Sequence, residues 1–420
     1  MSGFASMRLS FFLAVISLLF VPDVFTRLEN LEQNSKTYSH IHAKNNVCTI
    51  DFFAVDLKYN HGALKVLEFQ DGPQAGLRAH DEIFGKGLVW RMFWDWLAQF
   101  NVPIWYVGIL PRSIPDGNFS HYDKERIVFD YFLKNIKGRY VKDLKSLERD
   151  LEFKRVSHKE APQDSILTGC KGIVLIKDYP LRSIVNQLKK KYPNFVFINQ
   201  HSRRSSDNKF LTDQLFQDNE LKQFRPYARR FHKQYYSKLA HDIINEFGSD
   251  YYVIKPVNSS RSNGVIMATK EELDIVLKKI LVNKKPHGNF GGSYRPDKPL
   301  TYDYWLGDNN HTFIVEKYEP SQHIEVNGKL YDPTIRAICV MYNNNGNIVA
   351  EVLEAFWKIP PQPLSKYGDL TEMHVSKYRS DFSKLSKDDL TVKSIDMLNL
   401  KNILSSVISK VYVKMLDAGA

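Results

Sequence analysis

The most informative segment of the chain is Tyr251-Tyr-Val-Ile-Lys-Pro-Val-Asn-Ser-Ser-Arg-Ser-Asn-Gly-Val-Ile-Met267. It consists of an apolar run that ends in Lys255, a loop of small polar residues that ends in Gly264, and a second apolar run. A lysine at a strand end is a fixed cation, and a loop without bulky side chains can bring backbone N–H groups and hydroxyls against phosphate oxygens. The same pattern is also typical of a surface β-hairpin with a polar turn. The segment alone favours neither interpretation.

Two further strands are predicted downstream, and both carry charged residues. Residues 312–320 form an apolar run that turns charged at Glu316, and residues 332–341 form a strand with a carboxylate at Asp332 and a guanidinium at Arg336. In this order, the strand lysine, the small-residue loop and the two charged strands resemble the nucleotide site of the ATP-grasp superfamily. Members of that superfamily hold ATP between two α+β subdomains.

A β-hairpin is predicted near the N-terminus, over residues 51–77, and its second strand ends in Glu68-Phe69-Gln70. In most ATP-grasp enzymes a similar hairpin, with a Glu-x-Asn metal motif, lies near the C-terminus. The N-terminal position resembles the circularly permuted eukaryotic-type glutathione synthetase, over roughly residues 49–85 and 200–375. The resemblance implies a mixed α+β and α/β fold, in which a permuted ATP-grasp clamp follows an N-terminal α/β domain. The expected divisions are a signal-like segment (1–26), a substrate-side domain that contributes the hairpin (45–200) and a nucleotide-binding domain (201–420).

The resemblance also implies which residues hold the nucleotide and the metal. Contacts to the ATP phosphates would come from Lys209 and Lys255. The loop that covers the phosphates would contain Ser259, Ser260, Asn263 and Gly264. The hinge against adenine would be Val315, Glu316, Lys317 and Tyr318, with Asp332 near the ribose or the adenine amine. Mg²⁺ would be bound by Glu68 and Gln70, which offer the hard oxygen ligands that it prefers.

Several positions depart from the family pattern, and these departures argue against glutathione synthesis itself. Gln70 stands where the family has asparagine, and Ser259 stands where the loop has an acidic metal ligand. Pro73 and Ala75 replace serines that would hold a γ-glutamyl group.

The last predicted strand, over residues 347–359, carries further candidates. Strict alternation places Glu351 on the same face as Trp357, and Glu354 with Lys358 on the other face. The resemblance implies that Lys358, which falls close to the position of a substrate-binding arginine of the family, contacts a substrate carboxylate or acyl phosphate together with Arg336. Glu354 is the candidate to replace the missing metal ligand of the loop. All three positions are equally compatible with ordinary exposed strand residues.

The mechanism implied by the resemblance is attack of a substrate carboxylate on the γ-phosphate of ATP, which gives an acyl phosphate that an amine then captures. Mg²⁺ and lysines would offset the charge on the transferring phosphoryl group. Three classes of function remain open. They are an ATP-dependent carboxylate–amine ligase with unidentified substrates, an ATP-binding phosphotransferase or catalytically degenerate relative, and an exported binding protein without catalysis.

Composition and charge limit the partners of the chain. The 420 residues carry a formal net charge of +11, and 43% are hydrophobic, which is enough for a substantial core. The lysines are scattered, and no nucleic-acid-binding motif is present, so we expect no nucleic-acid partner. One arginine cluster near Lys209 is compatible with an anionic ligand or with a solvated helix face; its members are Arg203, Arg204, Arg225, Arg229 and Arg230.

The uncharged run from Leu9 to Val21 follows Arg8 and is typical of an export signal. A membrane anchor or a buried helix is the alternative, because no clear small-residue cleavage site follows. We therefore expect an exported or membrane-anchored protein that touches a membrane only through this segment. The three cysteines allow at most one disulfide within the chain.

The remaining patterns predict alternating helices and strands between and after the matching regions. Strands are expected over residues 102–109, 172–176 and 194–198, in a βαβ-like unit with a helix over 181–191. Further helices are expected over residues 80–100, 225–247 and 398–415, and a flexible loop over 285–303.

Overall fold

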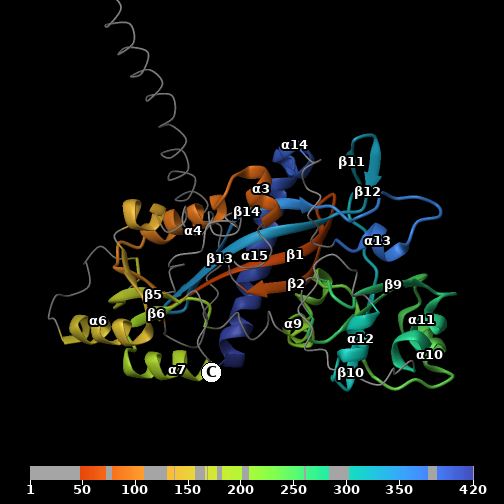
Figure 1. Ribbon diagram of the computed structural model, residues 1–420, viewed down its shortest axis with the longest axis horizontal. Coiled ribbons are helices and arrows are strands. Elements are labelled where there is room, and N and C mark those ends of the chain that lie inside the picture. Colours follow the sequence, from red (N-terminus) through yellow and green to blue (C-terminus); the bar gives the residue numbers. More distant parts are fainter. Residues whose placement is uncertain are drawn as a thin grey trace, which may run out of the picture. The chain divides into compact units, whose positions relative to one another are not determined.

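The computed structural model describes residues 48–71, 78–107, 130–136, 138–156, 166–167, 169–176, 182–200, 208–259, 262–282, 302–376 and 386–419. The export-type segment, Ser260, Pro73, Ala75, Arg203, Arg204 and most of the loop predicted over 285–303 lie outside these residues. In the described part of the chain, no helix is both long and apolar enough to cross a membrane. The described strands form three four-stranded sheets and a two-stranded one (Figure 1). The mixed α/β class predicted from the sequence is confirmed.

The largest elements belong to an antiparallel sheet with the order β14-β13-β1-β2. Its strands are β1 (Thr49–Asn60), β2 (Ala63–Asp71), β13 (Thr334–Asn344) and β14 (Asn347–Lys358). Two tight turns set the pairing. His61-Gly62 joins β1 to β2 and Asn345-Gly346 joins β13 to β14, and all four residues have positive φ, as two-residue hairpin turns that match the strand twist require. The N-terminal hairpin predicted from the sequence is therefore confirmed, and β1 pairs with β13.

The two faces of this sheet have different coverings. The C-terminal helix α15 (Ser394–Gly419) packs on one face, over a core that includes Phe53, Val55 and Leu57. On the other face, helix α4 (Leu88–Ala98) packs over the beginning of β1, at Phe52 and Ala54, and over the neighbouring parts of β13 and β14. Beyond Ala54 this second face becomes charged, and the candidate site lies there.

A parallel sheet in the order β4-β3-β5-β6 matches the predicted βαβ-like unit. Its strands are β3 (Ile104–Val107), β4 (Gly138–Val141), β5 (Gly172–Ile176) and β6 (Phe195–Phe197), with α6 (Leu144–Val156) and α7 (Arg182–Lys191) between them. The Asn199 side chain accepts a hydrogen bond from the Phe52 backbone N–H at 2.6 Å, which joins this sheet to β1.

The third large sheet is antiparallel and has the order β7-β10-β8-β9. Its strands are β7 (Ala228–His232), β8 (Tyr251–Pro256), β9 (Ile266–Thr269) and β10 (Thr312–Lys317). Helices α10 (Leu239–Phe247) and α11 (Leu273–Leu281) pack on one face around Tyr252, Ile254 and Phe313. Helix α9 (Lys209–Leu215) places Phe210 against Val257 and Ile314 on the other face. The segment 251–267 is thus a hairpin, and its lysine faces α9.

Two predicted helices are wrong in their bounds. The helix predicted over 80–100 is divided into α3 (Arg78–Phe84) and α4, because Gly85 and Gly87 between them adopt positive φ. The helix predicted over 225–247 contains only α10, since residues 228–232 form an edge strand beside β10. The other elements are η2 (Lys222–Phe224), α12 (Asp303–Gly307), β11 (Ile324–Val326), β12 (Lys329–Tyr331), α13 (Leu370–His374) and α14 (Lys387–Leu390).

Candidate functional site

A row of charged side chains crosses the face of the β14-β13-β1-β2 sheet that is opposite α15. Asp56 on β1 lies opposite Glu68 on β2 and Arg336 on β13. A bulge between Asp56 and Leu57 shifts the register, so that Glu68 projects from the same face as Asp56. Asp56 lies within the predicted hairpin, but the sequence assigned it no role.

Asp56 is the buried centre of this row. Its carboxylate accepts two hydrogen bonds from the Arg336 guanidinium, both at 2.8 Å, and one from the Lys358 ammonium at 2.7 Å. Burial opposes ionisation of Asp56, but Arg336 and Lys358 hold its pKa well below the ordinary value. Burial and the nearby Arg336 lower the pKa of Lys358. The two predicted catalytic cations therefore lie together, both paired with Asp56, and Lys358 is the more accessible.

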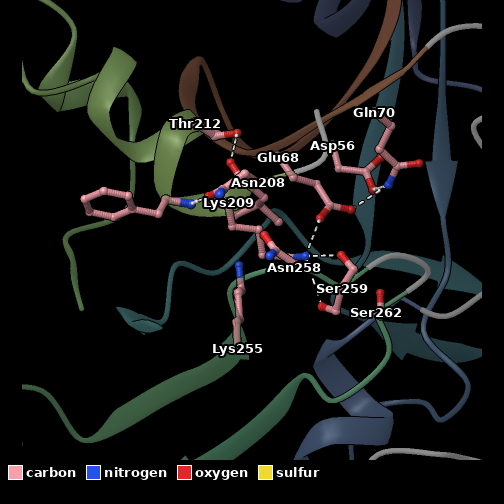
Figure 2. A network of polar contacts seen from close by, with 12 residues as sticks. Asp56, Glu68, Gln70, Asn208, Lys209, Thr212, Lys255, Asn258, Ser259 and Ser262 are labelled. Carbon is pink, nitrogen blue, oxygen red and sulfur yellow. Dashed lines mark hydrogen bonds and ion pairs between the residues drawn. The ribbon is translucent and has the colours of Figure 1, made fainter. Parts of the chain in front are cut away.

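Glu68 and Gln70, the predicted metal ligands, lie beside the predicted nucleotide lysine Lys209. The Glu68 carboxylate is 3.8 Å from the Lys209 ammonium. The Gln70 amide donates to Glu68 at 2.5 Å and to Asp56 at 3.1 Å. Figure 2 shows Glu68 approaching the contact between Lys209 and Ser259 from one side, while Lys255 approaches it from the other. The N-terminal hairpin and the Lys255 hairpin thus contribute to one site.

Lys209 is held at the start of α9 by a helix cap. The Asn208 side chain accepts hydrogen bonds from the backbone N–H groups of Phe210 and Leu211, which fixes the first turn. The Lys209 ammonium donates to the Ser259 carbonyl and, at 3.0 Å, to the Ser259 hydroxyl. Burial lowers the pKa of Lys209 despite the opposing effect of Glu68, and the charges of Lys255 and Glu316 also act on it. Removing this ammonium from water therefore has a cost that an anionic ligand would offset.

Lys255 lies at the end of β8 and is 7% exposed. Among the described residues its ammonium has one hydrogen-bond acceptor, the Glu316 carboxylate on β10. An ammonium carries three donors, so Lys255 retains donor capacity directed into the site. The other Glu316 oxygen accepts from Arg225 at 2.7 Å. Of the predicted arginine cluster, Arg225 is therefore buried in an ion pair, while Arg229 and Arg230 are exposed on β7.

The loop after Lys255 requires its glycine. Gly264 has φ +71°, and a Cβ there would lie 2.6 Å from the Pro256 side chain and 2.8 Å from Tyr304. The Gly264 carbonyl accepts a hydrogen bond from the Trp305 indole at 2.8 Å, and Asn263 beside it is half-buried. The loop therefore has a fixed backbone at this end, as a phosphate-binding loop requires.

The four predicted hinge residues differ in what they offer an adenine. The Val315 side chain belongs to the core under α10 and α11, and the Glu316 carboxylate is occupied by Lys255 and Arg225. Lys317 is exposed, and its backbone N–H donates to the Tyr227 carbonyl at 2.8 Å. Tyr318 turns back and donates to Asp332 at 2.7 Å. The side chains of Val315 and Glu316 are thus not directed at a ligand in this structure.

Asp332 is fully buried and both of its oxygens are occupied. One oxygen lies 2.7 Å from Lys58, 2.7 Å from the Tyr318 hydroxyl and 2.9 Å from His374, and the other accepts from the Ser321 N–H at 2.8 Å. Burial opposes ionisation, but Lys58 and the hydrogen bonds lower the pKa of Asp332 to about 2. The structure therefore makes Asp332 the acceptor that holds the Tyr318 hinge, rather than a free contact for ribose. Alternation along β1 places Lys58 on the face of Asp56, whereas no sequence signal indicates His374.

Glu354 does not reach the predicted metal site. Glu354 is on β14, opposite Ile338 of β13. Strands β13 and β1 lie between it and β2. At about 4.8 Å per strand, Glu354 is therefore roughly 14 Å from Gln70. A bulge between Ile338 and Cys339 also breaks the predicted alternation. Glu351 consequently accepts a hydrogen bond from Trp96 of α4, at 3.0 Å, on the face opposite Trp357. In the described chain no group of three His, Cys, Asp or Glu side chains could hold a metal ion.

Comparisons with known proteins give structural matches only. No protein-family model matches the chain, and no curated protein matches its sequence. A gamma-glutamylcysteine synthetase-type structure from Methylobacillus flagellatus aligns at 9% identity over 95% of both chains, with a TM-score of 0.41. A glutathione synthetase-like effector from Globodera pallida aligns at 10% identity over 74% of this chain and 76% of the other (TM-score 0.36), and a D-alanine–D-alanine ligase from Bacillus anthracis at 14% over 76% and 98% (TM-score 0.28). These are proteins of the ATP-grasp superfamily, which the sequence resembles. At these TM-scores no residue role is taken from them.

Proposed function

We propose that the chain binds ATP between two parts of the structure. One part is α9 with strands β8 and β10, and the other is the β1–β2 hairpin. The observation that carries this proposal is the buried Lys255 ammonium, which has one protein acceptor among the described residues and lies close to Lys209. Charge-assisted contacts from buried lysines to phosphate are strong because water competes poorly there. The fixed glycine loop beside Lys255 supports the same ligand.

The residues at Glu68 fit a magnesium ion that is held mainly by the nucleotide. Mg²⁺ in nucleotide sites takes one or two protein oxygens and completes its shell with phosphates and water. Glu68 offers a half-buried carboxylate, and the Gln70 amide nitrogen faces Glu68 and Asp56, so its oxygen is directed elsewhere. When bound, Mg²⁺ would neutralise phosphate charge.

We further propose that the chemistry is ATP-dependent ligation of a carboxylate to an amine through an acyl phosphate. Lys209 and Lys255 would hold the phosphates and offset the charge that develops on the transferred group. Lys358 is the best candidate to orient the carboxylate, because its ammonium is 16% exposed while Arg336 beneath it is almost fully enclosed. The carboxylate and amine substrates are open.

A screen for ADP release tests the ligase proposal. Purified protein with Mg-ATP is incubated with amino acids and small peptides, singly and in pairs, and ADP is measured. The proposal predicts ADP release that requires both a carboxylate and an amine. ATP binding without any such dependence would favour the second candidate, a nucleotide-binding protein that does not ligate. That candidate is favoured by the small number of metal ligands among the described residues. Asp56 is paired with Arg336 and Lys358, and Glu354 is distant, which leaves Glu68, itself bonded to Gln70.

We propose export for the protein on the pattern of residues 1–26 alone. Fusion of this segment to a reporter enzyme, with measurement of reporter outside the cell, tests export. Retention of the reporter inside the cell would contradict it.

A further inference from the structure

Glu316 joins two cations that come from different parts of the chain. One carboxylate oxygen accepts from Lys255 on β8, and the other accepts from Arg225 at 2.7 Å. The Glu316 side chain is 2% exposed. Burial opposes its ionisation, but Arg225 and Lys255 lower its pKa below the ordinary value. The carboxylate is therefore charged at neutral pH and occupies the lysine that the proposed function assigns to phosphate.

The Arg225 half of this arrangement is anchored on several sides. One guanidinium nitrogen donates to the Val66 carbonyl at 2.9 Å and to the Leu67 carbonyl, both on the edge strand β2. The guanidinium also lies 3.5 Å from Asp213. Arg225 is thus held in place independently of Lys255. If Lys255 turned to a ligand, Glu316 would keep its bond to Arg225 and would not be left as an unpaired buried charge.

The hydrogen bond between Lys255 and Glu316 is the one that a ligand can replace. In the described chain Lys255 has Glu316 as its one hydrogen-bond acceptor, and it lies at the end of its strand beside the glycine loop. A ligand that takes this ammonium must compete with a carboxylate tethered a few ångströms away, whose effective concentration is on the order of millimolar or higher. The ligand must also bind close to the negative charge of Glu316.

We propose that Glu316 is a specificity-determining residue that reserves Lys255 for a polyanion. An inorganic phosphate ion can gain only the exchanged contact. A nucleoside triphosphate gains Lys209 and the Glu68 metal position as well, and it can therefore displace the carboxylate. Both anions must displace the Glu316 carboxylate from Lys255, and the additional contacts of the triphosphate offset that cost, so the competing carboxylate selects against the smaller anion. This inference rests on the proposed nucleotide site and adds what that site rejects.

The test replaces the Glu316 carboxylate by an amide of the same shape. Glu316→Gln, the wild type and the control Glu246→Gln are titrated with inorganic phosphate and with tripolyphosphate by calorimetry. Glu246 is an exposed carboxylate on α10 that pairs with Arg229, away from Lys255. We expect Glu316→Gln to bind inorganic phosphate at least tenfold more tightly than wild type, with a smaller gain for tripolyphosphate. An unchanged or weaker phosphate affinity in Glu316→Gln would overturn the inference, as would an equal gain in Glu246→Gln.

A second variant serves if Glu316→Gln folds poorly. Glu316→Asp keeps the charge but shortens the side chain, so it cannot reach both cations, and an intermediate gain in phosphate affinity is expected. No gain in Glu316→Asp would count against the inference. A Mg-ATP titration of the wild type separates the two proposals. Wild-type binding of Mg-ATP without a phosphate gain in the variants removes this inference alone. A phosphate gain without wild-type binding of Mg-ATP removes the proposed function alone.

Discussion

Replacing Lys255 by alanine is the sharpest test of the proposed phosphate contact. The side chain is 7% exposed, and its ammonium donates a hydrogen bond to Glu316. A hydrogen bond from a buried charged group to a ligand contributes about 1.5–3 kcal/mol. That range corresponds to a loss of roughly ten- to hundredfold in ATP affinity.

On the proposal that Lys255 exchanges Glu316 for phosphate on binding, we expect the measured loss of ATP affinity to lie near the lower end of this range. Glu316 keeps Arg225 in the variant, so the buried carboxylate is not left without a partner. We therefore expect Lys255→Ala to remain folded, which circular dichroism and thermal unfolding would check before any binding measurement.

The assay is calorimetric titration of Mg-ATP into Lys255→Ala, the wild type and the control Lys142→Ala. Lys142 is an exposed lysine that lies next to β4 and far along the chain from the site. Its removal is expected to change ATP affinity less than twofold. Equal ATP affinities in the Lys255 and Lys142 variants would refute the reasoning.

Two further predictions concern stability. Because the pKa of Asp332 is lowered from 3.8 to about 2, its ionisation stabilises the fold by about 2 kcal/mol above pH 4, and this contribution is lost as the pH falls from 4 to 2. Urea unfolding at a series of pH values should show that the free energy of unfolding falls less steeply with decreasing pH in Asp332→Asn than in wild type. Identical dependences on pH in the two proteins would exclude the effect. Gly264→Ala should destabilise the protein by roughly 1–3 kcal/mol, because the residue has positive φ and its Cβ would meet Pro256 and Tyr304. An unchanged urea midpoint would show that the loop can relax.

Elements with a strong periodic pattern were predictable from the sequence. The hairpin at 251–267, the N-terminal hairpin, strand β5 and helix α15 lie where the alternation of apolar residues and the turn residues indicate. The two helices that were wrong in their bounds have different causes. Gly85 and Gly87, which adopt positive φ, divide the first helix, and an edge strand replaces the beginning of the second. Residues 228–232 are polar on an edge strand, so their strand character depends on pairing with β10, which local sequence does not encode.

The candidate site was predictable as a set of residues but not as a network. Lys209, Lys255 and Glu68, which lie far apart in the sequence, are brought together in the structure. The partners of the buried carboxylates were not predictable, because Arg225 joins Glu316 of one sheet to β2 of another, and His374 reaches Asp332 from a short helix. Glu354 lies on the predicted face but is separated from β2 by two strands, and the order of strands in the sheet is not encoded locally. The bulge changes the face of Glu351 instead.

The central claim is that one nucleotide site is built from the Lys255 hairpin and the N-terminal hairpin. Calorimetric titration of ATP at several Mg²⁺ concentrations, with wild type and Glu68→Gln, tests it most directly. The account predicts that wild type binds Mg-ATP, and that Glu68→Gln stays folded but requires at least several-fold more Mg²⁺ for the same ATP affinity, because the substitution keeps the side-chain volume and removes the charge. Absence of ATP binding to the wild type at millimolar Mg-ATP would contradict the account, and so would a Glu68→Gln variant with the Mg²⁺ dependence of wild type.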